Sequence, residues 1–293
     1  MERRTIFPGW TVPALLLVPQ MALTVLFFLW PTAVAVRASI MRADPFGLSE
    51  TFAGLDNFTA LFTDPLYLAA IGRTLVFCGA VTGLAVGLAV LLAVFADADI
   101  RGRGAYRAAL VWPYAVAPAA AGVIWALLLH PQIGGVAGLL KHLGIAWNYK
   151  LNDTQAMVAV VGASAWRQVS YNFIFVLAGL QSIPRTIIDA ARMDGARGWR
   201  RFRTILLPML APTLAFLVVV NLVYSAFETF GTIEALTQGG PGQATQTLMV
   251  KVYRDGVVNL DLGASAAQSV VLMVLVMGLT ALQFHFLRRR GER

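Results

Sequence analysis

Long stretches without a charged side chain divide this sequence into segments. Five windows lack Asp, Glu, Lys and Arg altogether, and a sixth is interrupted only by Arg167. A helix needs about 20 predominantly apolar residues to cross a bilayer, and each window reaches that length. The pattern therefore predicts six membrane-spanning helices, over residues 12–36, 71–96, 108–130, 155–180, 208–230 and 263–287. Pro113 and Pro118 are expected to kink the third of them.

The composition is that of a protein whose solvent is lipid. Hydrophobic residues make up 58% of the 293 residues and charged residues only 13%, whereas soluble domains carry about 25% charge. These values exclude an ordinary soluble domain and a disordered chain. A single cysteine, Cys78, excludes an internal disulfide, and the three histidines show no metal-ligand spacing. We expect an all-α integral membrane protein without a metal site.

Positive charges favour one side of the predicted membrane region. Of the 23 Lys and Arg residues, 15 lie in segments on the side of the N-terminus and 7 on the opposite side. Because cytoplasmic loops carry the excess of Lys and Arg, both termini are expected in the cytoplasm. This topology accounts for the net charge of +8 without a nucleic-acid partner.

The first predicted helix also has features of a signal peptide. Arg3 and Arg4 precede its apolar stretch, and Ala33 and Ala35 frame a small-residue cleavage pattern. The apolar stretch is much longer than the hydrophobic region of a signal peptide. We therefore interpret it as a retained anchor helix.

The predicted cytoplasmic loop 181–207 has a pattern of its own, that of two short helices joined by a glycine. Ser182 is expected to cap the first helix, and Gly195 to end it in a left-handed conformation. The second helix is expected to end at Pro208. The loop is either an interfacial amphipathic segment or a docking element for another protein.

The run from Asp189 to Pro208 resembles the "EAA" motif of ABC importer permeases. It matches that motif at fixed spacing and departs from it at Asp189, where the motif has Glu. The matching positions are Ala190, Ala191, Gly195, Ala196, Phe202, Ile205, Leu207 and Pro208. Segments 44–47, 54–58, 113–118, 170–173, 221–224 and 264–270 are similar to the maltose-type (carbohydrate uptake 1) family, in particular its importers of sn-glycerol-3-phosphate.

The resemblance implies a type I ABC importer permease fold in a bacterial inner membrane, crossed several times. It divides the chain into an anchor helix with a short cytoplasmic tail (1–36), a periplasmic loop (37–70), a permease core with the coupling loop 181–207 (71–287) and a cytoplasmic tail (288–293). The implied partners are a second homologous permease, two cytoplasmic ATPases that hold ATP and Mg, and a periplasmic binding protein. The residues implied to couple transport to an ATPase are Asp189, Ala190, Ala191, Asp194, Gly195 and Ala196.

The implied activity is import of sn-glycerol-3-phosphate by alternating access, driven by the separate ATPase. The chain would be a pore subunit and not an enzyme by itself. It contains no Gly-Lys dipeptide and hence no P-loop for ATP, which agrees with nucleotide, and every other cofactor, being held elsewhere.

The candidate substrate path consists of polar residues within the predicted helices. Ionisable groups in a bilayer are costly and usually face a cavity or a partner. Arg167 is expected to share a helix face with Tyr171 and Asn172, where its planar fork suits a phosphate. Its alternative partners are Glu228 or backbone carbonyls. The remaining candidates are Asn221, Tyr224 and Glu228 on the fifth helix and Gln268 on the sixth.

Other functional classes fit the sequence less well. Within the permease class, the substrate could instead be a sugar or a glycerophosphodiester. An ion-coupled secondary transporter would need carboxylates near mid-membrane, and only Glu228 comes near that description. A membrane enzyme would need a catalytic set of side chains at membrane depth, and none is evident.

Overall fold

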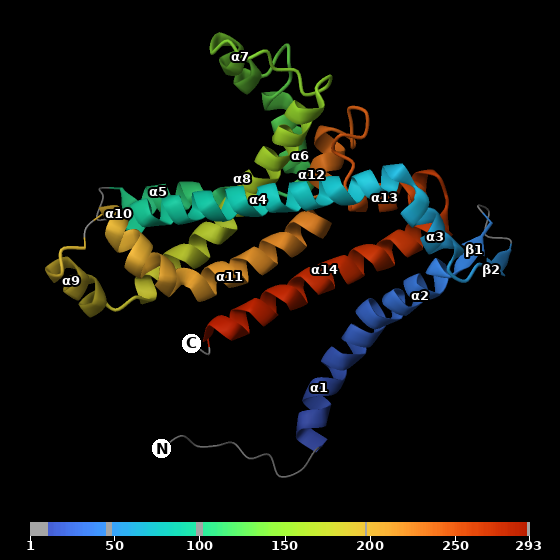
Figure 1. The fold of residues 1–293 in the computed structure, drawn as a ribbon, viewed down its shortest axis with the longest axis horizontal. Helices are drawn as coiled ribbons and strands as arrows, with labels where there is room; N and C mark the ends of the chain where they lie inside the picture. The colour runs from blue at the N-terminus through green and yellow to red at the C-terminus, as the bar shows by residue number, and fades with distance from the viewer. Residues whose placement is uncertain (1–10, 45–48, 98–101, 197, 292–293) are drawn as a thin grey trace. The chain divides into compact units, whose positions relative to one another are not determined.

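The computed structural model describes residues 11–44, 49–97, 102–196 and 198–291, and nearly all of its elements are helices (Figure 1). One antiparallel hairpin, β1 (Met41–Ala43) with β2 (Glu50–Phe52), is the exception in the described part of the chain. The prediction of an all-α membrane protein is therefore confirmed, with this small addition. Some residues behind these predictions lie outside the described residues: Arg3 and Arg4 before the first helix, positions 45–47 of segment 44–47, and Arg101, Arg197 and Arg293, which belong to the charge count.

The first compact unit contains the chain up to Asp64 and a later segment, Val252–Val271. Its long N-terminal helix runs without a break over Thr11–Ser39, as α1 (Thr11–Thr24), the π-helical turn η1 (Val25–Leu29) and α2 (Trp30–Ser39). No side chain of α1 or η1 is buried. An apolar helix of this kind is stable only where lipid surrounds it.

The short helix α3 (Asp56–Thr63) is hydrogen-bonded to the end of α2 and to β1. The amide of Asn57 donates hydrogen bonds to the carbonyls of Ser39 and Met41, both at 2.9 Å. The later segment adds the π-helical turn η5 (Arg254–Val258) and the first residues of α14 (Leu262–Gly291). Gly263 lies so close to the hairpin that a Cβ there would be 2.6 Å from the carbonyl oxygen of Met41.

The second compact unit contains Pro65–Lys251 and Leu272–Arg293. Its longest helices are α4 (Pro65–Asp97), α8 (Asp153–Ser182) and α11 (Leu207–Val223). Shorter elements connect them: α5 (Arg103–Val111), the 3-10 turn η2 (Trp112–Ala115), α6 (Pro118–Leu128), α7 (Gly135–His142), α9 (Arg185–Met193), α10 (Gly198–Arg201), η3 (Phe202–Leu206), η4 (Tyr224–Glu228), α12 (Phe230–Leu236) and α13 (Leu248–Tyr253).

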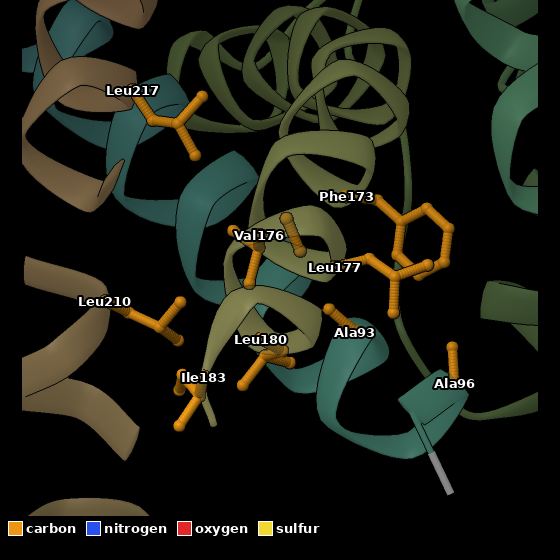
Figure 2. Close-up of a cluster of buried hydrophobic side chains, with 10 residues drawn as sticks. Ala93, Ala96, Phe173, Val176, Leu177, Leu180, Ile183, Leu210 and Leu217 are labelled. Atoms are coloured by element: carbon orange, nitrogen blue, oxygen red, sulfur yellow. The ribbon is translucent and has the colours of Figure 1, made fainter. Parts of the chain in front are cut away.

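The core of the second unit forms where α4, α8 and α11 meet. Ala89, Ala93 and Ala96 present small side chains along one face of α4. Small residues let helix backbones approach closely in lipid, where contact between apolar side chains alone drives little association. Figure 2 shows Leu210 and Leu217 of α11 packed beside the side chains of α8; the α8 members are Phe173, Val176, Leu177 and Leu180.

Among the described residues, four continuous helices are long and apolar enough to span a membrane, and there are six candidates if each of two bent pairs counts as one span. The continuous helices cover Thr11–Ser39, Pro65–Asp97, Gly198–Glu228 and Leu262–Gln283. The predicted third span is bent by 106° between Gly104–Ala115 and Pro118–Leu128, which confirms the expected kink. The fourth span, Asp153–Gln181, is followed after a 71° bend by α9.

The predicted end of the loop at Pro208 is wrong. α10, η3 and α11 continue as one helix, so the loop runs directly into the fifth span. Proline ends a helix because it lacks an N–H and its ring meets the carbonyl four residues earlier. Here the wider π-helical turn η3 immediately precedes Leu207 and Pro208, and it lets the helix pass the proline.

Candidate functional site

A cavity of about 310 Å³ lies among η2, α8, α11 and η4 of the second unit. Three predicted path residues line it: Tyr171, Tyr224 and Glu228. Tyr114 and Gln168 line it as well, together with valines of α11. Sequence reasoning missed these two residues. Gln168 lies three positions before Tyr171 on the same helix, and Tyr114 falls between the two prolines of the predicted kink, so the helical period and the kink were the available signals.

Arg167 lies beside this cavity and is held at one end of its guanidinium. Its Nε donates a hydrogen bond to the carbonyl oxygen of Val116 at 2.8 Å. The guanidinium carbon is 5.2 Å from the ring centre of Tyr114 and 5.6 Å from that of Tyr224, within the range of cation–π attraction. Arg167 therefore contacts two of the tyrosines that line the cavity.

The carbonyl of Val116 is free to accept this bond because the third span breaks there. Val116 is extended, with ψ of 127°, and the next helix begins at Pro118 after the extended Ala117. Proline suits the first turn of a helix because no N–H is needed there. Because of this break, the carbonyl of Val116 is not used within a helix and accepts the hydrogen bond from Arg167 on α8.

One nitrogen of Arg167 keeps its hydrogen-bonding capacity. Nη1 is buried and has no hydrogen-bond partner. Among the described residues, Arg167 forms no ion pair with Glu228, whose side chain is exposed. Of the alternatives weighed above, the contact with a backbone carbonyl is present, and an unpaired donor that suits a phosphate is present too. The functional role of Arg167 stays a prediction.

Asn172 and Asn221 bind each other across α8 and α11. Asn172 donates to Asn221 at 3.1 Å, and Asn221 donates back at 2.7 Å and also to the carbonyl of Leu217 at 2.7 Å. Both side chains are fully buried. Five residues along a helix correspond to a rotation of about 140°, so Asn172 faces α11 while Arg167 faces Val116. The expected common face of these two residues is not observed, and neither asparagine lines the cavity.

Gln268 belongs to the first compact unit, on the part of α14 that precedes Leu272. Its amide donates a hydrogen bond of 2.6 Å to the carboxylate of Asp255. Its side-chain oxygen is buried without a partner. Its place on the substrate path stays a prediction.

The predicted coupling residues lie on α9 and on the turn that ends it. Asp189, Ala190 and Asp194 are exposed, whereas Ala191 and Ala196 are 5% and 8% exposed. Asp189 forms an ion pair with Arg192 at 3.1 Å; at such an exposed position the pair contributes little stability.

Gly195 ends α9 as predicted, with φ of 75°. Its N–H donates to the carbonyl of Arg192, and the N–H of Ala196 donates to that of Ala191. These two bonds define a Schellman motif, which satisfies the last carbonyls of a helix. The predicted cap by Ser182 is wrong: its hydroxyl donates to the carbonyl of Gly179 and closes α8 instead.

A large apolar side chain projects from the end of α9. Met193 is 88% exposed, although it belongs to a loop between two membrane spans. Sequence reasoning did not include it among the coupling residues; its position two residues before Gly195 in the motif was the available signal. Flexible methionine side chains adapt readily to a partner surface.

Known proteins are similar to this chain over most of its length. The family model described as "Binding-protein-dependent transport system inner membrane component" matches residues 86–292. The "sn-glycerol-3-phosphate transport system permease protein UgpA" of Brucella abortus is 54% identical over 288 residues, with 98% of each chain covered. The protein of the same description from Rhizobium meliloti is 51% identical, also with 98% of each covered.

A solved structure shows the same fold at low sequence identity. It is described as "Crystal structure of bacterial alginate ABC transporter in complex with alginate pentasaccharide-bound periplasmic protein", and it superposes with a TM-score of 0.79 at 21% identity. The match covers 95% of this chain and 94% of that chain. The predicted importer permease fold is thereby confirmed. The chain belongs to the family of inner membrane components of binding-protein-dependent transport systems, and it is a transport subunit with several spans.

Proposed function

We propose that this chain is a pore-forming permease subunit of an ATP-driven importer of sn-glycerol-3-phosphate. The observation that carries the proposal is whole-length similarity, at 54% and 51% identity, to permeases named for that substrate. The geometry supports it, because a cationic side chain with an unpaired donor lies beside a membrane cavity.

The cavity suits a small ligand that carries both a negative charge and hydroxyl groups. Arg167 supplies positive charge and the free Nη1 donor, and charge-assisted bonds to phosphate are among the strongest hydrogen bonds in proteins. Gln168 offers an amide that can pair with a hydroxyl group. Glu228 lines the same cavity, and its carboxylate repels a phosphate. These charges favour a substrate orientation in which the phosphate lies beside Arg167 and the glycerol lies toward Glu228.

The energy for transport is proposed to come from partner subunits. The complex would contain a second homologous permease, two cytoplasmic ATPases that hold ATP and Mg, and a periplasmic binding protein. α9 would dock on one ATPase through its exposed residues, including Asp189 and Met193. A short rigid helix can pass a movement of its partner to the spans, because α9 lies between Asp153–Gln181 and Gly198–Glu228. In the orientation that the distribution of Lys and Arg predicts, α9 and both termini are cytoplasmic.

Uptake of labelled sn-glycerol-3-phosphate by vesicles that contain the full complex tests the proposal. We expect ATP-dependent uptake by the wild type, and a loss of about tenfold or more in Arg167→Ala, as for the removal of one charge-assisted hydrogen bond. Arg167→Lys should recover part of the uptake, because it keeps the charge without the planar fork. Arg42→Ala is the matched control, since Arg42 is an exposed arginine of the hairpin.

Competitors identify the substrate. Unlabelled maltose and glycerophosphocholine should not displace the labelled phosphate ester. Wild-type transport of maltose or glycerophosphocholine in its place would keep the permease assignment and discard the substrate. Uptake that follows an ion gradient without ATP would contradict the proposal altogether. Unchanged uptake by Arg167→Ala would show that Arg167 only supports the kink at Val116.

A further inference from the structure

An apolar groove of about 490 Å³ lies between the C-terminal part of α4 and the segment formed by α10 and η3. Figure 1 shows α10 beside that end of α4. α4 contributes Gly87, Val90, Leu91, Val94 and Phe95. The opposite wall consists of Gly198, Trp199, Arg201, Phe202 and Leu206. The groove is separate from the cavity beside Arg167 and shares no residue with it.

The position of the groove determines what surrounds it. Its α4 wall belongs to the continuous span Pro65–Asp97, so the bilayer is its solvent. Leu91 and Phe95 are 52% and 61% exposed, which is the arrangement expected of side chains that face lipid tails. An acyl chain can therefore enter the groove from the side without leaving the hydrocarbon region.

The opposite wall carries positive charge and an interfacial aromatic residue. Arg201 is the arginine of this wall, and its Nε is buried and lacks a hydrogen-bond partner. Trp199 is 72% exposed and stacks on Phe202 with 5.2 Å between ring centres. Tryptophan favours the boundary between acyl chains and headgroups. The groove thus combines an apolar floor with a lining arginine whose Nε lacks a hydrogen-bond partner.

We propose that this groove binds one anionic phospholipid. An acyl chain occupies the apolar part against Val90, Val94 and Phe95, and the headgroup phosphate accepts hydrogen bonds from Arg201. Basic pockets between membrane helices on the cytoplasmic side bind anionic headgroups for the same reason. A soluble protein partner fits less well, since the floor of the groove lies on a membrane span.

The site has a structural consequence for the segment that follows α9. The bound lipid joins α10 and η3 to α4, and so it anchors the connection between Gly195 and the fifth span. This inference does not depend on the substrate of the importer.

Native mass spectrometry of the detergent-purified complex tests the proposal, with added phosphatidylglycerol or phosphatidylcholine. The wild-type complex should retain one more phosphatidylglycerol than the Gly87→Leu complex. Gly87 is exposed, and a Cβ there would meet no atom within 4 Å, so the leucine fills the groove without disturbing the helix. Gly79→Leu is the matched control, because Gly79 lies on the same helix with equally open surroundings and does not line the groove.

The charge is tested with a second pair of variants. Arg201→Gln should weaken phosphatidylglycerol retention about tenfold, as expected for the loss of a charge-assisted hydrogen bond. Arg203→Gln removes an exposed arginine two residues away and should leave retention unchanged.

Several outcomes would overturn the proposal. Equal retention in the Gly87→Leu and wild-type complexes would show that lipid does not occupy the groove. Equal retention of phosphatidylcholine would show that the groove does not select an anionic lipid. Loss of an ATPase subunit from the Gly87→Leu complex with lipid retention intact would identify a protein as the occupant.

Discussion

The Asn172–Asn221 pair and Arg167 differ in how many of their polar atoms have a hydrogen-bond partner. Asn172 and Asn221 exchange hydrogen bonds with each other and are fully buried. Arg167 uses Nε for a single hydrogen bond to a backbone carbonyl and leaves Nη1 unpaired. Asn172 and Asn221 serve as each other's partners and hold α8 and α11 together, whereas a buried donor without any partner favours the binding of a ligand.

The asparagine pair is expected to stabilise the contact between α8 and α11. Asn172→Leu leaves the buried side-chain oxygen of Asn221 without its donor and should lower the free energy of unfolding by about 1–2 kcal/mol. The thermal midpoint of the purified complex measures the loss. The double variant Asn172→Leu/Asn221→Leu should recover most of it, because no buried polar group is then left unpaired. A double variant that is less stable than both single variants would contradict this account.

At the scale of elements, two of the four π-helical turns in the described part of the chain come immediately before prolines. η1 (Val25–Leu29) precedes Trp30 and Pro31, and η3 (Phe202–Leu206) precedes Leu207 and Pro208. In both places the helix continues beyond the proline. The wide turn changes the phase of the side chains that follow it. Faces assigned with a constant period of 3.6 residues are therefore reliable only within the segments between such turns.

Close packing of α6 against α12 depends on the absence of a side chain at Gly122. A Cβ at this position would lie 2.7 Å from the carbonyl oxygen of Thr232 and 2.8 Å from Cβ of Ala235. Gly122→Ala should destabilise the protein by about 1–3 kcal/mol, the usual cost of overpacking. Gly138→Ala in α7 is the control, since its surroundings are open and alanine favours the helix. Thermal unfolding that ranks the two variants in the opposite order would contradict the packing argument.

The left-handed turn at the end of α9 is expected to be necessary for coupling. Gly195→Leu forces a branched side chain into a conformation with φ of 75° and should cost about 1 kcal/mol locally. Membrane insertion should be normal, but ATP hydrolysis should continue with several-fold less transport per ATP. Gly195→Asn should keep most of the transport, because asparagine tolerates this conformation. Full transport by Gly195→Leu would count against the coupling role.

At the scale of the whole molecule, the single cysteine allows a direct test of orientation. Cys78 is only 6% exposed, so it gives little background reaction with a water-soluble maleimide. Lys150→Cys should react when the impermeant reagent is added outside cells, and Arg185→Cys only in inverted vesicles. Both replaced residues are exposed. Reaction of Arg185→Cys from outside would reverse the predicted topology.

The spans could be predicted from sequence because hydropathy is a local property. Windows with at most one charged residue predicted the four continuous candidate spans and the two bent pairs of the described residues, and Pro113 and Pro118 indicated the bend between Gly104–Ala115 and Pro118–Leu128. The hairpin of Met41–Ala43 and Glu50–Phe52 was not predicted, since its strands are short and lie in a polar loop. The left-handed Gly195 was predicted because few other residues adopt that conformation.

Side-chain partners of the site could be predicted only in part. Tyr171, Tyr224 and Glu228 line one cavity; Tyr224 and Glu228 are four residues apart, and that spacing predicts a common helix face. The pairing of Asn172 with Asn221 depends on how α8 and α11 are rotated about their axes, and no local pattern records that rotation. Likewise, the acceptor for Arg167 exists only because a different helix breaks at Val116.

Because of the Schellman motif at Gly195, the C-terminal end of α9 is ordered before a partner docks on it. Its last carbonyls are satisfied within the chain by the N–H groups of Gly195 and Ala196, so a partner need not order the segment when it binds. Preorganised surfaces lose less entropy on association. Little of the binding free energy between α9 and its partner is therefore spent on ordering α9. A displacement of the partner is then transmitted through a rigid α9 to the spans Asp153–Gln181 and Gly198–Glu228.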